Sequence, residues 1–110
     1  MPLELCTALA ASAGAGPRLV ECLTLWLTNL MLSERDPDAE AAALVATLQT
    51  QVAPVVLVTN EVGWGIVPDN PLARRFRDAQ GRLNQRIATV ADRVELVAVG
   101  LPLTLKGETP

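Results

Sequence analysis

Residues 55–65, Val-Val-Leu-Val-Thr-Asn-Glu-Val-Gly-Trp-Gly, decide how this chain folds. The apolar run 55–58 ends abruptly in three polar residues, 59–61, and two glycines follow closely. A continuous apolar run is typical of a strand buried in a parallel sheet. Open α/β sheets bind their ligands in the crevice beyond the carboxyl ends of such strands. The stretch therefore predicts a buried strand that delivers polar side chains to a binding site.

A long helix is predicted directly downstream, over residues 70–91. Asn70 is a suitable N-cap, and Pro71 fits the first helical position. Gly81 interrupts the helix and suggests close packing there. Apolar residues recur every three or four positions along one face, at Leu72, Phe76, Ala79, Leu83, Ile87, Val90 and Val94.

The remaining segments alternate between helices and strands. We expect a helix over 3–13, a short strand at Leu19-Val20 that ends in Glu21, and an apolar helix over 23–33 that is buried on most sides. A further helix begins at Asp36-Pro37, with an apolar stripe formed by Ala41, Leu44, Val45, Leu48 and Val52. Residues 94–99 read as the last core strand and 103–106 as an edge strand. This order predicts an α/β fold with a mostly parallel sheet flanked by helices.

Length and composition limit the class of protein. A chain of 110 residues is one domain or part of one. Half of its residues are apolar and its mean hydropathy is +0.30, so we expect an apolar face that needs a partner. The net charge of −3 argues against nucleic acid as a main partner.

Targeting signals and metal motifs are not apparent in the sequence. The two cysteines, Cys6 and Cys22, have no metal-binding spacing, and we expect them to be reduced. The start lacks a basic region, so it does not read as a signal peptide. The apolar run 23–32 is far shorter than the ~20 residues that a membrane span needs. We therefore expect a cytoplasmic protein without a membrane span.

Two blocks of sequence together carry a family resemblance. The first is Glu-Cys-Leu-Thr-Leu-Trp-Leu-Thr-Asn-Leu at 21–30, and the second runs from Val58 through the arginine-bearing segment 74–86. In order and spacing they resemble the C-terminal part of adenosylcobinamide kinase/adenosylcobinamide-phosphate guanylyltransferase, from about Pro2 to Lys106. The resemblance implies a partial P-loop core related to RecA-type ATPases. Residues 1–106 would form the C-terminal part of one such domain, and 107–110 a tail.

The resemblance implies a two-step transferase activity of cobalamin biosynthesis. Members of this family phosphorylate adenosylcobinamide with ATP or GTP, then transfer GMP from GTP through a guanylylated histidine, with Mg²⁺ accompanying the nucleotide. The 110 residues contain no histidine and no GxxxSGKS phosphate loop. We therefore expect a chain that is inactive alone and that forms a homo-oligomer or associates with the missing N-terminal part. The alternatives are a non-catalytic remnant or interaction module and, less in keeping with the paired blocks, an α/β domain without nucleotide chemistry.

Five residues are candidates for the site. Glu21 closes a strand where P-loop proteins place the acid that handles magnesium, directly or through water. Glu61 is a candidate base or positioning group for the substrate hydroxyl. Thr59, Asn60 and Trp64 are candidate substrate contacts. The structural alternatives are an exposed strand-end glutamate at 21, a loop brace at 60–61 and a hydrophobic plug at 64.

Other polar residues are more ambiguous. Six of the nine basic residues are arginines between positions 74 and 93, and they form either a solvated helix face or, for one or two, a contact with phosphate or a subunit. Residues 84–86, Asn-Gln-Arg, cannot all face one way, and solvent or inter-helix hydrogen bonds are the favoured interpretation. Thr24, Thr28 and Asn29 are expected to satisfy one another or a neighbouring subunit.

The absence of histidine from the 110 residues yields a first prediction. The isolated chain should form no stable guanylyl adduct, because no imidazole is present to accept the nucleotide. Incubation with labelled GTP followed by denaturing electrophoresis tests this. A labelled band at the mass of the chain would contradict the prediction.

Overall fold

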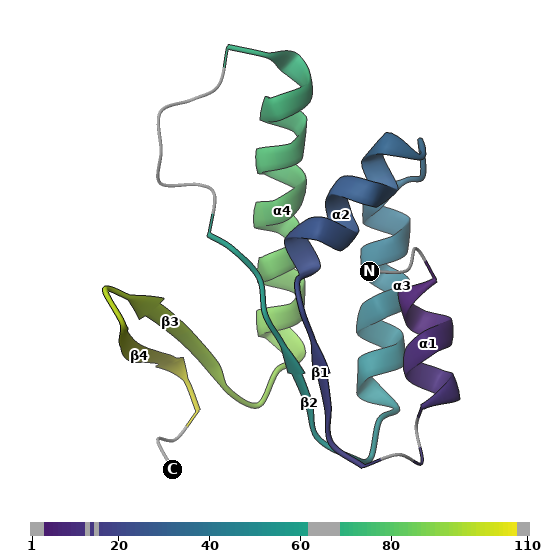
Figure 1. Cartoon of the computed structure of the whole chain (residues 1–110), viewed down its shortest axis with the longest axis vertical. Coiled ribbons are helices and arrows are strands. Elements are labelled where there is room, and N and C mark those ends of the chain that lie inside the picture. Colours follow the sequence, from purple (N-terminus) through teal and green to yellow (C-terminus); the bar gives the residue numbers. More distant parts are fainter. Residues whose placement is uncertain (1–3, 13, 15, 62–68, 108–110) are drawn as a thin grey trace.

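The computed structural model describes residues 4–12, 14, 16–61 and 69–107. The elements in chain order are α1 (Leu5–Ala11), β1 (Arg18–Val20), α2 (Leu23–Leu32), α3 (Pro37–Gln49), β2 (Val55–Leu57), α4 (Pro71–Val90), β3 (Val94–Ala98) and β4 (Leu101–Lys106) (Figure 1). The predicted α/β class and all of the predicted elements are confirmed, with boundaries that shift by a few residues.

Strands β1 and β2 are parallel neighbours. Leu19 lies beside Val56, and Val20 beside Leu57. The pairing continues past the end of β2, where the Val58 N–H donates to the carbonyl of Val20 at 2.9 Å. The carboxyl ends of both strands therefore meet at one edge, as the apolar run at 55–58 predicts.

The two longest helices begin where the sequence places them. The Asp36 side chain accepts hydrogen bonds from the N–H groups of residues 38 and 39, and Pro37 occupies the first turn of α3. The Asn70 side chain caps α4 in the same way, and Pro71 follows it. The close packing expected at Gly81 is wrong, because an added Cβ there would meet no atom within 4 Å.

The core lies among the four helices and the inner face of the β1–β2 pair. Its buried side chains come from every one of these helices and from β1: Leu5, Leu9, Val20, Leu23, Trp26, Leu27, Leu30, Ala41, Leu44, Ala79, Leu83 and Ile87. Helix α2 is indeed buried over most of its surface, although Leu25 and Leu32 are exposed. The predicted stripe of α3 is correct for its first four members, but Val52 lies beyond the helix end and is fully exposed.

The single sheet of three core strands is not observed. Strand β3 pairs antiparallel with β4 in a separate sheet, and this hairpin extends away from helices α1–α3 (Figure 1). Val97 and Val99 are 67 % and 95 % exposed, so the prediction of a core strand at 94–99 is wrong for this chain. Most residues of the β3–β4 hairpin are exposed, and none of its side chains is fully buried.

The exposed face of the β1–β2 pair corrects a second expectation. Leu19 is 60 % exposed and Val56 57 %, whereas Val20 and Leu57 face the helices. The run 55–58 is thus buried on one side only. Parallel sheets are normally covered on both faces, so the pair presents an apolar surface without a described cover.

Burial predicts which residue of the α3 stripe stabilises the fold. Leu44→Ala should lower the free energy of unfolding by about 2–5 kcal/mol, because Leu44 is fully buried in the core. Urea unfolding followed by circular dichroism measures the change. Val52→Ala is the matched control and should change stability by less than ~0.5 kcal/mol. Equal effects of the two substitutions would contradict this description of the core.

Candidate functional site

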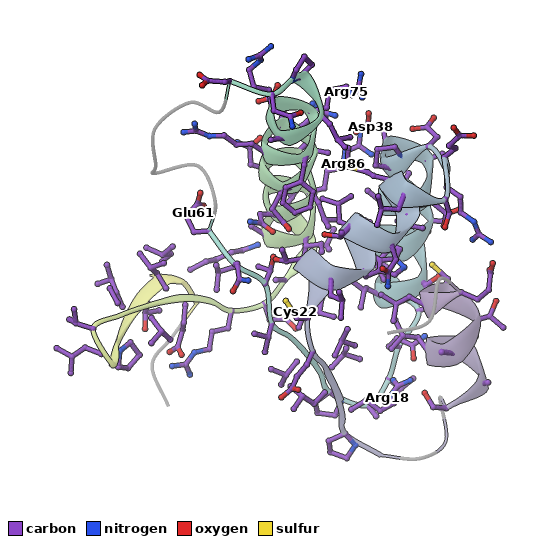
Figure 2. The ribbon with its side chains drawn as sticks, turned by 45° about the horizontal axis from the view of Figure 1, so that its top comes forward. Arg18, Cys22, Asp38, Glu61, Arg75 and Arg86 are labelled. Carbon is purple, nitrogen blue, oxygen red and sulfur yellow. The ribbon has the colours of Figure 1, made fainter. Side chains whose placement is uncertain are left out.

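The candidate site lies at the shared carboxyl edge of β1 and β2. The Leu23 N–H donates to the carbonyl of Val58 at 2.8 Å, which ties the start of α2 to the end of β2. Glu21 and residues 59–61 therefore leave the sheet at the same edge, and all four are exposed. Figure 2 shows Glu61 beyond the end of β2 and Cys22 where β1 turns into α2. Trp64 lies outside the described residues.

Hydrogen bonds from two helices hold the backbone of Asn60. The Asn60 N–H donates to Thr24 Oγ1 of α2 at 3.0 Å. Its carbonyl accepts from Asn84 Nδ2 of α4 at 3.4 Å. Thr28 donates to the Thr24 carbonyl, as expected if the polar residues of α2 satisfy one another. The Thr24 hydroxyl, in contrast, bonds to Asn60 at the candidate site. Thr24 and Asn84, which the sequence did not predict as part of the site, therefore hold the backbone at this edge of the sheet.

Gln80 extends this network into the protein interior. Its Nε2 donates to Thr59 Oγ1 at 3.0 Å and to Asn84 Oδ1 at 2.9 Å, and Thr59 Oγ1 donates to Asn84 Oδ1 at 2.9 Å. Sequence reasoning missed Gln80. A signal was present, because position 80 follows Phe76 by four residues and precedes Leu83 by three, on the apolar side of α4.

Cys22 occupies the N-cap position of α2, next to Glu21 in the chain. Burial and the neighbouring Glu21 carboxylate raise the pKa of its thiol, but hydrogen bonds from the Leu25 N–H and from the Thr24 hydroxyl and N–H outweigh them. The pKa of Cys22 therefore lies below its ordinary value. The same edge of the sheet thus carries the carboxylates of Glu21 and Glu61, several other polar side chains and a thiol whose pKa is lowered.

Several arginines of the 74–93 segment pair with other residues of the chain. Arg82 pairs with the Asp38 carboxylate at 3.0 Å, and Arg86 donates to the Asp38 carbonyl at 3.0 Å, so both tie α4 to the first turn of α3 (Figure 2). Arg93 pairs with Glu95. The interpretation of this charge run as a solvated face is therefore incomplete. The inter-helix hydrogen bond expected within residues 84–86 is confirmed for Arg86, which reaches Asp38 of α3. It is wrong for Asn84, which bonds instead to Thr59 and Asn60 beyond the end of β2.

A pocket of about 300 Å³ lies away from the strand ends, between the end of α2, the start of α3 and the first half of α4. Its lining includes Met31, Glu34, Leu72, Arg75 and Asp78, with acidic and basic groups in mixture. Of the predicted site residues that the structure describes, Glu21, Thr59, Asn60 and Glu61, none lines it. We place the candidate site at the strand ends rather than in this pocket, because the strand ends bring the chemically distinctive side chains together.

In residues 4–12, 14, 16–61 and 69–107, no group of three or more Asp, Glu, Cys or His side chains could hold a metal ion by itself. The helices within these ranges are all too short or too polar to cross a bilayer.

The fold and the candidate site together define an α/β protein in which polar side chains gather beyond the ends of two parallel strands. Residues 1–105 match the family model described as cobinamide kinase / cobinamide phosphate guanyltransferase. The chain belongs to this family, whose fold is of the P-loop NTPase kind, and the resemblance recognised in the sequence is confirmed.

Similar proteins carry names that are consistent with this family. The chain is 47 % identical to the bifunctional adenosylcobalamin biosynthesis protein CobP of Pseudomonas aeruginosa over 97 % of its own length. It is 48 % and 45 % identical to the CobU proteins of Salmonella typhimurium and Escherichia coli, over 80 % of its length in each case. The chain spans 64 % of the length of the Pseudomonas protein and 57 % of each of the other two.

The hydrogen bonds to Cys22 predict how its reactivity depends on pH. In a Cys6→Ser background, alkylation by iodoacetamide should have a midpoint below that of an ordinary thiol. Thr24→Val should raise the midpoint, because it removes one donor that stabilises the thiolate. The stabilisation from this lowered pKa is fully present above the pKa of the unfolded thiol and is lost as the pH falls through the folded pKa.

Thr28→Val is the matched control for Thr24→Val. Thr28 lies one turn further along α2, and its hydroxyl donates to the Thr24 carbonyl rather than to Cys22. Its replacement should leave the midpoint unchanged. A midpoint that shifts equally in both variants would contradict a specific effect of the Thr24 hydroxyl.

Proposed function

We propose that this chain carries the strand-end half of a cobinamide kinase and cobinamide-phosphate guanylyltransferase site. The complete activity would phosphorylate adenosylcobinamide with ATP or GTP and then transfer GMP from GTP to that phosphate. The observation that carries the proposal is the position of Glu21 and residues 59–61 at one edge of the β1–β2 pair, in a chain that belongs to this family.

Each candidate residue has a proposed role. Glu21, at the end of β1, serves the magnesium-nucleotide complex. Glu61 positions the substrate hydroxyl or accepts its proton. Thr59 and Asn60 contribute polar contacts to phosphate or to the corrinoid side chain, and Trp64 is proposed to stack on the corrinoid.

The donor set of this edge suits Mg²⁺. This ion prefers oxygen ligands and is usually held by one or two carboxylates together with water and substrate phosphates. Glu21 supplies an exposed carboxylate at the end of β1. When bound, the ion would neutralise charge on the phosphates. The chain itself would contribute the Glu21 oxygens and the polar side chains at 59–61.

We also propose that activity requires a second polypeptide segment, either the phosphate-loop part of the family or further copies of the chain. The 110 residues contain neither a histidine nor a phosphate loop. Leu19 and Val56 expose an apolar face, and β3 stands apart from β2. A strand with unpaired backbone groups is a template for association, so an added segment would cover this surface. The same surface favours the second candidate function, a non-catalytic interaction module.

Complementation tests the proposal. The chain is co-expressed with the portion of the Pseudomonas aeruginosa relative that lies outside the match, and light scattering should then show a stable complex. The complex should phosphorylate adenosylcobinamide and form GDP-cobinamide. Glu21→Gln should lower kcat about 10²–10³-fold, because it removes the charge that faces the magnesium-nucleotide complex.

Glu34→Gln is the matched control. Glu34 is also an exposed glutamate, but it lines the distant pocket rather than the strand ends. This variant should retain the parental rate. A complex without activity would favour the interaction module, and equal losses in the two variants would contradict the role of Glu21.

A further inference from the structure

Gln80 is an unusual feature of the interior. Its side chain is 0 % exposed, and it is the one buried polar residue in the part of the chain that the structure describes. Its Nε2 makes two hydrogen bonds, but its Oε1 accepts none from the residues that the structure describes. A buried acceptor without a donor is destabilising, whereas an apolar side chain of similar shape avoids that cost. Stability alone therefore does not account for glutamine at this position.

The bonds that Gln80 does make all lead to the end of β2. It holds Thr59 Oγ1 and Asn84 Oδ1 together, and Asn84 Nδ2 in turn reaches the carbonyl of Asn60. On the other side of Asn60, Thr24 Oγ1 of α2 accepts a hydrogen bond from the Asn60 N–H. The peptide groups on both sides of the Asn60 Cα are thus fixed from α2 and α4, while the side chains of Asn60 and Glu61 remain exposed.

We propose that Gln80 and Asn84 form a positioning clamp for the reaction. The clamp sets the direction in which residues 59–61 leave β2, and it thereby presents the side chains of Asn60 and Glu61 to the substrate. Neither clamp residue needs to touch the substrate. The inference rests on the proposed function for its purpose, but the clamp itself is measurable in the isolated chain.

Amide hydrogen exchange measured by NMR on the isolated chain tests the clamp. Asn84→Ala should accelerate exchange of the Asn60 amide about fivefold, because it removes the hydrogen bond to the Asn60 carbonyl. Gln80→Met should also accelerate this exchange, because it removes the side chain that holds Asn84 in place. The amides of Leu23 and Val58, which bond within the strand pairing, should keep their rates. The melting temperature of Gln80→Met should equal or exceed that of the parent chain.

Gln85→Met is the matched control, since it makes the same chemical change on an exposed face of α4. It should leave every one of these exchange rates unchanged. If Gln80 has only a structural role, Gln80→Met should instead lower the melting temperature and accelerate amide exchange at Leu23, Val58 and Asn60 together. That result, or an unchanged Asn60 rate, would overturn the clamp.

The complemented enzyme supplies the functional measurement. Gln80→Met should lower kcat about tenfold with little change in KM for the nucleotide, because misplacement of reacting groups slows the chemical step. Faster Asn60 exchange with an unchanged kcat would overturn the positioning role. An inactive parental complex would contradict the proposed function, and the clamp is then decided by the exchange rates alone.

Discussion

The parallel pairing of β1 with β2 is the constraint on which the rest of the structure depends. Six residues in two strands bring Glu21 and the 59–61 segment to one edge, although about forty positions separate them in the chain. The hydrogen bond from Leu23 to Val58 then starts α2 directly at that edge. Side chains of both α2 and α4 hold Asn60, so the packing of these two helices also determines the geometry of the candidate site.

Local chemistry explains what could be predicted from the sequence. Asp36-Pro37 and Asn70-Pro71 mark helix starts because capping and ring geometry act within a few residues, and the polar residues after an apolar run mark a strand end. Sheet composition is not local. Nothing within 94–99 reveals that this strand pairs with 101–106 instead of joining β2. The contacts of Gln80 were unpredictable for the same reason, since they depend on which turn of α4 lies against residue 59.

Several charged side chains join one helix or strand of this chain to another. Arg82 and Arg86 meet Asp38 at the start of α3, and Arg18 donates to the Leu9 carbonyl and to Gln51, so it links α1, β1 and the residues after α3. The strand-end edge is different in character. It presents the exposed carboxylates of Glu21 and Glu61 beside the hydroxyl of Thr59 and the amide of Asn60, a set of oxygen-bearing groups of the kind that Mg²⁺ prefers.

The central claim is that ligands bind at the carboxyl ends of β1 and β2 and not in the pocket beside Glu34 and Arg75. Chemical-shift mapping tests it most directly, with ¹⁵N-labelled chain in the complemented complex titrated with magnesium and GTP. We expect the largest changes on residues 21–24 and 59–61. Changes confined to residues 31–37 and 72–82, which surround the pocket, would contradict it.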